Sequence, residues 1–294
     1  MMLGNSLAAL QGEPAAVRVG QVTVVTWPAQ HNLGIDLARR AGRPTEWPGL
    51  GLRTPGPLQL IIVPDGRLLD SLSTGRAPAW GAAIALPGVR TILLRADRDE
   101  LYGTLRHELA HLALHQAVKG RVPLWFDEGY ASWAAGEWDR LGVLDLNLAV
   151  VRGAVPDLRS LDGALRGSAT TADAAYALAV SAVTELARRN PSGSLTPLLR
   201  RLEAGEDFDA AVLATTGLTM PQYDIEWRRT IRRRYSLATW ILAGGGWGLL
   251  AFSMWALVRV RRRADVPRRA ALDEGWEIPP ETPDTPELDR THEP

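Results

Sequence analysis

Short hydrophobic runs separated by glycine and proline make up the first hundred residues of the chain. They are rich in β-branched residues, which is typical of strands. These runs lie at residues 16–27, 58–63, 80–86 and 89–96. Between them, PTEWPGLGLRTPGP at residues 44–57 has the composition of a loop. The pattern therefore predicts a β-rich N-terminal part.

The pattern changes to helical spacing near residue 99. Leucines recur three or four positions apart up to residue 119, and Gly120 is placed to end the helix. Further helices are predicted at residues 128–138, 172–190, 195–204, 206–215 and 220–234. Strands followed by helices favour an α+β fold over alternating βαβ units. We expect an N-terminal mixed β-sheet packed on the helix of residues 99–119, followed by a mainly helical subdomain.

One long stretch near the C-terminus carries no charged residue. SLATWILAGGGWGLLAFSMWALV, residues 236–258, has 23 residues without a formal charge. A helix of that length measures about 34 Å, enough to cross a hydrocarbon core of roughly 30 Å. The stretch therefore predicts one transmembrane helix. The alternative is a buried core helix, although core helices seldom run this long without a charge.

Arginines flank this stretch on both sides, so the positive-inside rule leaves the orientation open. They are Arg228, Arg229, Arg232, Arg233 and Arg234 before it, and Arg259, Arg261, Arg262 and Arg263 after it. Anionic lipid headgroups explain this placement more simply than nucleic acid does. The 33 basic and 33 acidic residues of the chain also cancel, so no global field attracts nucleic acid. We expect lipid, and no nucleic acid, as a partner.

These patterns divide the chain into four parts. They are an N-terminal segment at 1–14, one domain at 15–234 (15–98 mainly β, 99–234 mainly α), the membrane helix at 236–258, and a basic then acidic, proline-rich tail at 259–294 that we expect to be disordered. The first residues, MMLGNSLAAL, lack the basic start and the apolar run of a signal peptide. Either the domain stays in the cytoplasm, or a leader begins upstream and residues 1–14 are its remnant.

A five-residue motif in the predicted helix carries candidate metal chemistry. The chain has no cysteine, so a metal has to be held by His, Asp or Glu. His107, Glu108 and His111 form H-E-x-x-H. Residues four apart share a helix face, so the two imidazoles can bind one zinc ion, and Glu108 lies beside it as a general base. An amphipathic helix also produces this pattern by chance, so the motif alone leaves the question open.

A third ligand is predicted further along the chain. Sixteen residues separate His111 from Glu128, which stands in the sequence WFDEGYASW. Gly120 and Pro123 break the chain between them, so a second helix can begin near Asp127 and bring Glu128 against the first. An acid at a helix start is usually a cap, and that role fits Asp127 better. We predict Glu128 as the third metal ligand.

HELAH followed by WFDEGYA resembles the gluzincin metallopeptidases, in particular the peptidase MA-like proteins that carry a membrane anchor. The close match covers residues 106–133. The resemblance implies that Zn²⁺ is held by His107, His111 and Glu128, with Glu108 as the general base. It also implies that the strand before the active helix, near residues 90–96, pairs with an extended substrate backbone. It further implies a single-pass membrane protein whose catalytic domain faces outward.

The chain departs from this family pattern at one position. Thermolysin-like relatives often have a carboxylate four residues after the ligand Glu, where it orients a histidine, and this chain has Ser132 there. That support has to come from elsewhere, and Asp127 is one candidate. Tyr176 has two interpretations: it donates a hydrogen bond to the oxyanion, as a tyrosine does in related peptidases, or it is one aromatic in an alanine-rich core helix.

Two functions follow from these patterns. The first is a membrane-anchored, zinc-dependent peptidase that hydrolyses peptides or proteins by metal-activated water, with Glu108 as base and Tyr176 as a candidate catalytic residue. The alternative is a non-catalytic, membrane-anchored binding or scaffolding module on a metallopeptidase-like fold. Degenerate relatives commonly lose the Glu of H-E-x-x-H first, so the intact motif argues for the enzyme.

Overall fold

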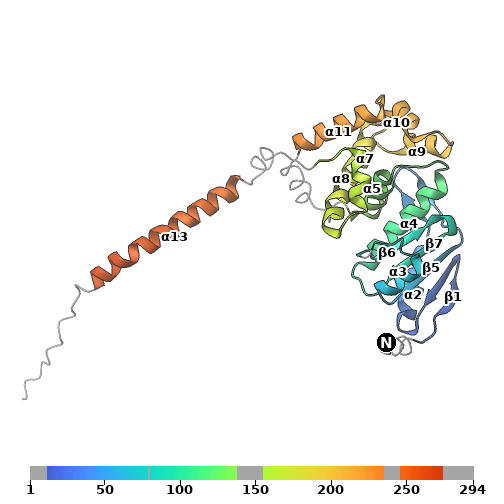
Figure 1. Cartoon of the computed structure of the whole chain (residues 1–294), viewed down its shortest axis with the longest axis horizontal. Coiled ribbons are helices and arrows are strands. Elements are labelled where there is room, and N and C mark those ends of the chain that lie inside the picture. Colours follow the sequence, from blue (N-terminus) through green and yellow to red (C-terminus); the bar gives the residue numbers. More distant parts are fainter. Residues whose placement is uncertain (1–11, 79, 138–154, 235–245, 274–294) are drawn as a thin grey trace, which may run out of the picture. The chain divides into compact units, whose positions relative to one another are not determined.

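A computed structural model describes residues 12–78, 80–137, 155–234 and 246–273 of this chain (Figure 1). The chain divides into two compact units, residues 1–237 and residues 238–294.

A five-stranded mixed sheet forms the N-terminal part of the first unit. In spatial order its strands are β1 (Ala15–Val19), β2 (Val22–Thr26), β5 (Leu58–Val63), β7 (Thr91–Arg95) and β6 (Ala83–Leu86). The three central strands run parallel, and each of the two outer strands is antiparallel to its neighbour. All five coincide with runs predicted as strands, with β1 beginning one residue earlier than its run, and the predicted mixed sheet is therefore confirmed.

Two helices and a short hairpin in this part were not predicted. The helices are α2 (His31–Ala41) and α3 (Gly66–Ser73), and the hairpin pairs β3 (Thr45–Trp47) with β4 (Gly51–Arg53) inside the stretch expected to be a loop. Parallel neighbours need crossover connections, which α2 and α3 supply. A purely strand-then-helix order was therefore wrong for residues 15–98.

The sheet is covered by helices on both faces. Alternate residues of β2, β5 and β7 pack against α2 and α4 (Leu101–Ala117) on one face. The opposite face, with Val63 and Leu93, packs against Leu69 of α3. Period-two alternation on buried strands produces these two apolar layers.

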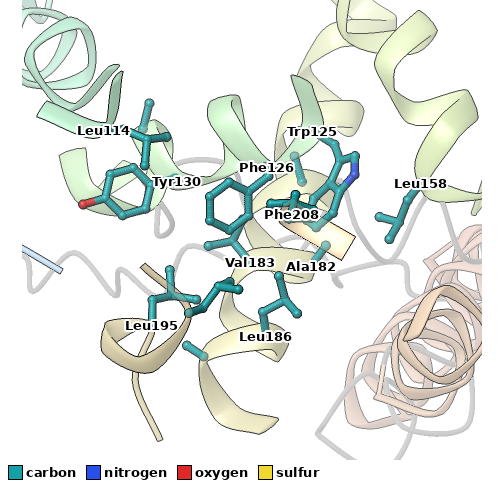
Figure 2. Close-up of a cluster of buried hydrophobic side chains, with 14 of the residues drawn as sticks. Leu114, Trp125, Phe126, Tyr130, Leu158, Ala182, Val183, Leu186, Leu195 and Phe208 are labelled. Carbon is teal, nitrogen blue, oxygen red and sulfur yellow. The ribbon is translucent and has the colours of Figure 1, made fainter. Parts of the chain in front are cut away.

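Helices make up the second part of the first unit. They are α5 (Leu124–Ala135), α7 (Leu158–Leu165), α8 (Ala169–Arg189), α9 (Thr196–Glu203), α10 (Phe208–Thr216) and α11 (Met220–Arg234). Aromatic rings fill their common core: Phe126 and Phe208 meet with ring centroids 4.9 Å apart, and Trp125 lies 5.9 Å from Phe208 (Figure 2). α7 was not predicted, whereas helices at the other five places were. The coarse α+β architecture is confirmed.

Within this core, α5 and α8 approach each other closely at Gly129. A Cβ atom on Gly129 would lie 2.5 Å from the carbonyl oxygen of Ala179 and 2.9 Å from a methyl group of Val183. Only a residue without a side chain allows the two helix backbones to come this close. Gly129 directly follows Glu128, so this contact fixes the part of α5 that carries the predicted third ligand.

The second unit contains the helix α13 (Gly246–Asp273). Residues 236–245 of the predicted membrane span lie outside the described residues. In the part of the chain that the structure describes, no helix is long and apolar enough to cross a bilayer.

The contact between α5 and α8 predicts a pair of opposite effects on stability. Gly129→Ala forces two backbones apart and should lower the free energy of unfolding by about 1–3 kcal/mol or more. Gly163→Ala is the matched control, because Gly163 is exposed in α7 with open space around a new Cβ. It should be neutral or stabilising by up to ~1 kcal/mol. Denaturant unfolding measures both, and equal effects would contradict the close packing.

Candidate metal centre

The helix α4 packs against both the core under the sheet and the core of the helical part, and this determines where its polar residues point. Leu105 and Leu112 pack with the sheet, while Ala110 and Leu114 pack with the helical core. Apolar neighbours therefore occupy two sides of α4. The polar positions of H-E-x-x-H are left on the strip between these sides, facing a groove.

The helix α5 brings Glu128 to the same strip. It begins at Leu124, directly after Pro123, and the Asp162 carboxylate on α7 accepts a hydrogen bond of 2.8 Å from the backbone N–H of Trp125. The expectation that Asp127 caps this helix was wrong, because the helix starts three residues earlier and Asp162 serves its start. With α5 fixed in this way, Glu128 faces α4.

Three donor atoms meet at the centre of this arrangement. The Nε2 atoms of His107 and His111 lie 3.2 Å apart. Oε2 of Glu128 lies 3.5 Å from the first and 3.6 Å from the second. Tetrahedral zinc with bonds of about 2.0–2.1 Å places neighbouring donors roughly 3.3–3.4 Å apart. The three residues therefore fit a zinc ion in both donor type and spacing.

A carboxylate lies behind each imidazole. Nδ1 of His107 is 3.1 Å from Oε2 of Glu137, and Nδ1 of His111 is 2.7 Å from Oδ1 of Asp127. A carboxylate at Nδ1 holds the proton there and leaves Nε2 free as a metal donor. Ser132, where relatives carry a carboxylate, is 3.5 Å from Nδ1 of His107 and is buried. Glu137 thus supplies the acid that this position lacks.

His115 extends the same network toward solvent. Its Nε2 lies 2.7 Å from Oδ2 of Asp127, so that carboxylate bridges His111 and His115. A metal could also be held by His111, His115 and Asp127. However, that set would use Nδ1 of His111, which Asp127 already engages, so the set built on Glu128 fits better.

Burial and opposite charge together set the pKa values of these groups. Burial lowers the pKa of His107, but hydrogen bonds with Glu128 and Glu137 outweigh it and raise the pKa to about 10. The pKa of His111 is likewise raised by neighbouring Asp127 and Glu128 against the effect of burial. The imidazoles in turn lower the pKa of Asp127 to about 2 and also lower that of Glu128, although burial opposes both shifts. The site therefore concentrates negative charge that protons, or a bound cation, must balance.

Glu108 differs from the other acids because it lies beside this cluster rather than in it. It is 7% exposed, and burial raises the pKa of its carboxyl. The backbone N–H of Ala85 on β6 donates a hydrogen bond to it. A carboxyl with a raised pKa, fixed at a groove wall, is suited to accept and return a proton.

The groove runs between β6 with its preceding loop and the helices α4, α5 and α8, and encloses about 690 Å³. β6 is an edge strand of the described sheet. The backbone N–H of Arg95 donates to the carbonyl of Ala82. Because hydrogen-bonded and free positions alternate along an antiparallel strand, the backbone groups of Ala83 and Ala85 point away from β7. The expectation that the strand near 90–96 meets the substrate was wrong, because β7 is paired on both sides. β6 is the strand with an edge facing the groove.

Tyr176 also lies in the groove wall. Its ring meets that of His107 edge-on, with centroids 6.3 Å apart, and it contacts the helical core from a partly buried position. Burial and the nearby Glu128 carboxylate raise the pKa of its hydroxyl, which therefore keeps its proton. A protonated hydroxyl beside the donor atoms is able to donate a hydrogen bond, so this geometry is compatible with both interpretations of Tyr176.

Several residues that complete the site have no strong signal in the sequence. Glu137 follows Gly136, which ends α5 with φ of +79°, and only the fold brings its carboxylate back to His107. Asp162 lies on an unpredicted helix. The serine at position 132, where a carboxylate was expected, was the one feature of the sequence that indicated another acid near His107.

Comparison with known proteins identifies a family for most of the chain. The sequence profile of the Peptidase MA superfamily matches residues 50–233. A search of curated proteins found no match. The matched region includes β5 to β7 and every residue of the metal centre described above.

The carboxylate behind His107 provides a test of the geometry around the metal ligands. Glu137→Gln should weaken zinc binding about 10–100-fold, because Nδ1 of His107 loses its anionic partner. Ser132→Ala is the matched comparison and should change it little, since its hydroxyl lies at 3.5 Å. Titration against a chelator of known affinity measures both. A larger loss for Ser132→Ala than for Glu137→Gln would contradict the assignment.

Proposed function

The chain belongs to the Peptidase MA superfamily, and on that premise we propose that it is a zinc-dependent peptidase. The superfamily match supports a metallopeptidase-like fold, and such proteins are typically metal-dependent. The observation that carries the proposal is the triangle of donor atoms from His107, His111 and Glu128, with edges of 3.2, 3.5 and 3.6 Å. This spacing supports the proposal because it matches the distances between donors around a tetrahedral zinc ion.

These three residues would hold the ion in our proposal. Zinc bound there would supply a Lewis acid for the scissile carbonyl and lower the pKa of a bound water toward ~7. Three protein ligands leave one position of a tetrahedral site open, as catalytic zinc requires. Asp127 and Glu137 keep the two imidazoles in the tautomer that presents Nε2.

Glu108 moves the protons of the reaction. In the first half it accepts a proton from the attacking water as the new C–O bond forms. In the second half it passes that proton to the leaving nitrogen as the C–N bond breaks, so the products are a carboxylic acid and an amine. The raised pKa of this buried carboxyl supports the role, because a weaker acid is a stronger base.

The edge of β6 positions the substrate in this proposal. An extended peptide can add to an edge strand through main-chain hydrogen bonds, here to the outward groups of Ala83 and the outward carbonyl of Ala85, whose N–H bonds to Glu108. Tyr176, on the opposite wall, donates a hydrogen bond to the oxygen that becomes negative during attack. Its raised pKa supports this role, because the hydroxyl stays protonated.

We also propose that the enzyme is anchored to a membrane, with the first unit outside the cytoplasm. The support is the run of 23 residues without formal charge at 236–258, flanked by arginines, together with the family resemblance. Alkaline extraction of membranes decides this point, and a chain released into the soluble fraction would exclude the anchor.

A non-catalytic binding module is the alternative, and one substitution separates the two. Glu108→Gln removes the base but none of the predicted ligands, so the chain should keep its zinc and lose at least about a hundredfold in hydrolysis. A mixed peptide library read by mass spectrometry measures cleavage, and elemental analysis measures zinc. Full hydrolysis by Glu108→Gln would contradict the general-base role. A zinc-loaded wild-type chain that cuts nothing in the library would favour the binding module.

A further inference from the structure

Two arginines in the groove have no acidic partner among the residues that the structure describes. Arg76 lies in the loop between α3 and β6, and Arg166 directly follows α7. Both are exposed, and neither guanidinium forms an ion pair within the described part of the chain. The acidic side chains of the groove are Glu108, Asp127, Glu128 and Glu137. Three of these contact imidazoles and the fourth receives the N–H of Ala85, so none of them neutralises the arginines.

Both arginines lie on segments of the groove wall that are in contact with each other. The indole N–H of Trp80, just before β6, donates a hydrogen bond of 3.3 Å to the carbonyl of Gly167, just before α8. The Trp80 ring also meets Tyr176 edge-on, with centroids 6.4 Å apart. Arg166 is the neighbour of Gly167, and Arg76 belongs to the segment that carries Trp80. The arginines therefore belong to the two segments that this hydrogen bond joins, one before β6 and one before α8.

The helix α8 sets the distance from these segments to the metal centre. Tyr176, beside His107, lies seven residues after the start of α8 at Ala169, which is about 10 Å along the helix axis. An extended peptide covers roughly 3.3 Å per residue. A group held near the start of α8 is thus within about three residues of a bond positioned at the metal centre.

We infer that Arg76 and Arg166 bind a carboxylate of the substrate, within about three residues of the scissile bond. A guanidinium presents paired N–H donors that match the two oxygens of a carboxylate. Both a C-terminal α-carboxylate and an acidic side chain offer this group. The inference rests on the proposed function, because that function makes the ligand a peptide. It adds that the enzyme prefers peptides with a carboxylate at this position.

Binding to a chain that cannot turn over tests this directly. Four fluorescent peptides of one length are offered to the full-length, zinc-loaded Glu108→Gln chain. They are a neutral peptide with a free C-terminus, its C-terminal amide, the amide with one Glu near the centre, and the same amide with Gln there. At least one carboxylate peptide should bind about tenfold more tightly than its neutral counterpart. Preference for the free acid assigns the C-terminus, and preference for Glu over Gln assigns a side chain.

The arginine variants assign the preference to residues. In the same Glu108→Gln background, Arg76→Gln or Arg166→Gln should reduce it severalfold while leaving the affinity of the neutral amide unchanged. Arg43→Gln is the control, because Arg43 is exposed and outside the groove. Equal affinities for all four peptides, or a preference that survives both groove substitutions, would overturn the inference. A preserved preference in a wild-type chain without hydrolysis would overturn the proposed function and leave the carboxylate site standing.

Discussion

The site depends on the mutual neutralisation of ionisable groups that the fold encloses together. Two imidazoles and three carboxylates lie within hydrogen-bond or ion-pair distance where α4 meets α5, and the side chains of His107 and His111 are only 12% and 11% exposed. Removing charges from water is costly unless opposite charge is close by. The carboxylates therefore need a positive charge between them, from protons or from a metal. A divalent cation bound to both Nε2 atoms would meet that need in one place.

Apolar packing makes this enclosure possible. The helix α4 contacts the sheet through one set of residues and the helical core through another, so its polar strip has one remaining direction. The helix α5 packs closely against α8 at Gly129, and the Asp162 carboxylate accepts a hydrogen bond from its first turn. Both helices are therefore fixed before any ligand is added, and fixed elements favour precise donor spacing. The groove is the space left where the two cores diverge.

Local patterns in the sequence predicted the parts of the structure that are governed by local rules. The H-E-x-x-H helix is found where its leucine spacing predicts it, and the β-branched runs form strands. The order in which those strands pair could not be predicted from the sequence. Substrate pairing was therefore expected at residues 90–96, which form the interior strand β7, whereas β6 lies at the edge that faces the groove. Helices α2, α3 and α7 were missed; they are short, of 11, 8 and 8 residues, and helices of this length depend on tertiary contacts for their stability.

In the candidate site, too, local patterns predict some residues and only the fold brings the others together. His107, Glu108 and His111 are joined by helix periodicity, and Glu128 by a break and a second helix, so spacing was enough to group them. Glu137 reaches His107 only through the bend of the chain after α5, which no periodic pattern encodes. Arg76 and Arg166 come from loops 90 residues apart, so only the folded groove brings them together.

In our proposal, a cation bound by His107, His111 and Glu128 balances the charge of the site. Elemental analysis of the full-length chain, exposed to zinc and then exchanged into zinc-free buffer, tests it most directly. Glu128→Ala is the informative variant, and Glu13→Ala, an exposed site away from the groove, is its control. We expect about one zinc per chain in the wild type and in Glu13→Ala, and clearly less in Glu128→Ala. Equal zinc in all three, or none in a folded wild-type chain, would contradict it.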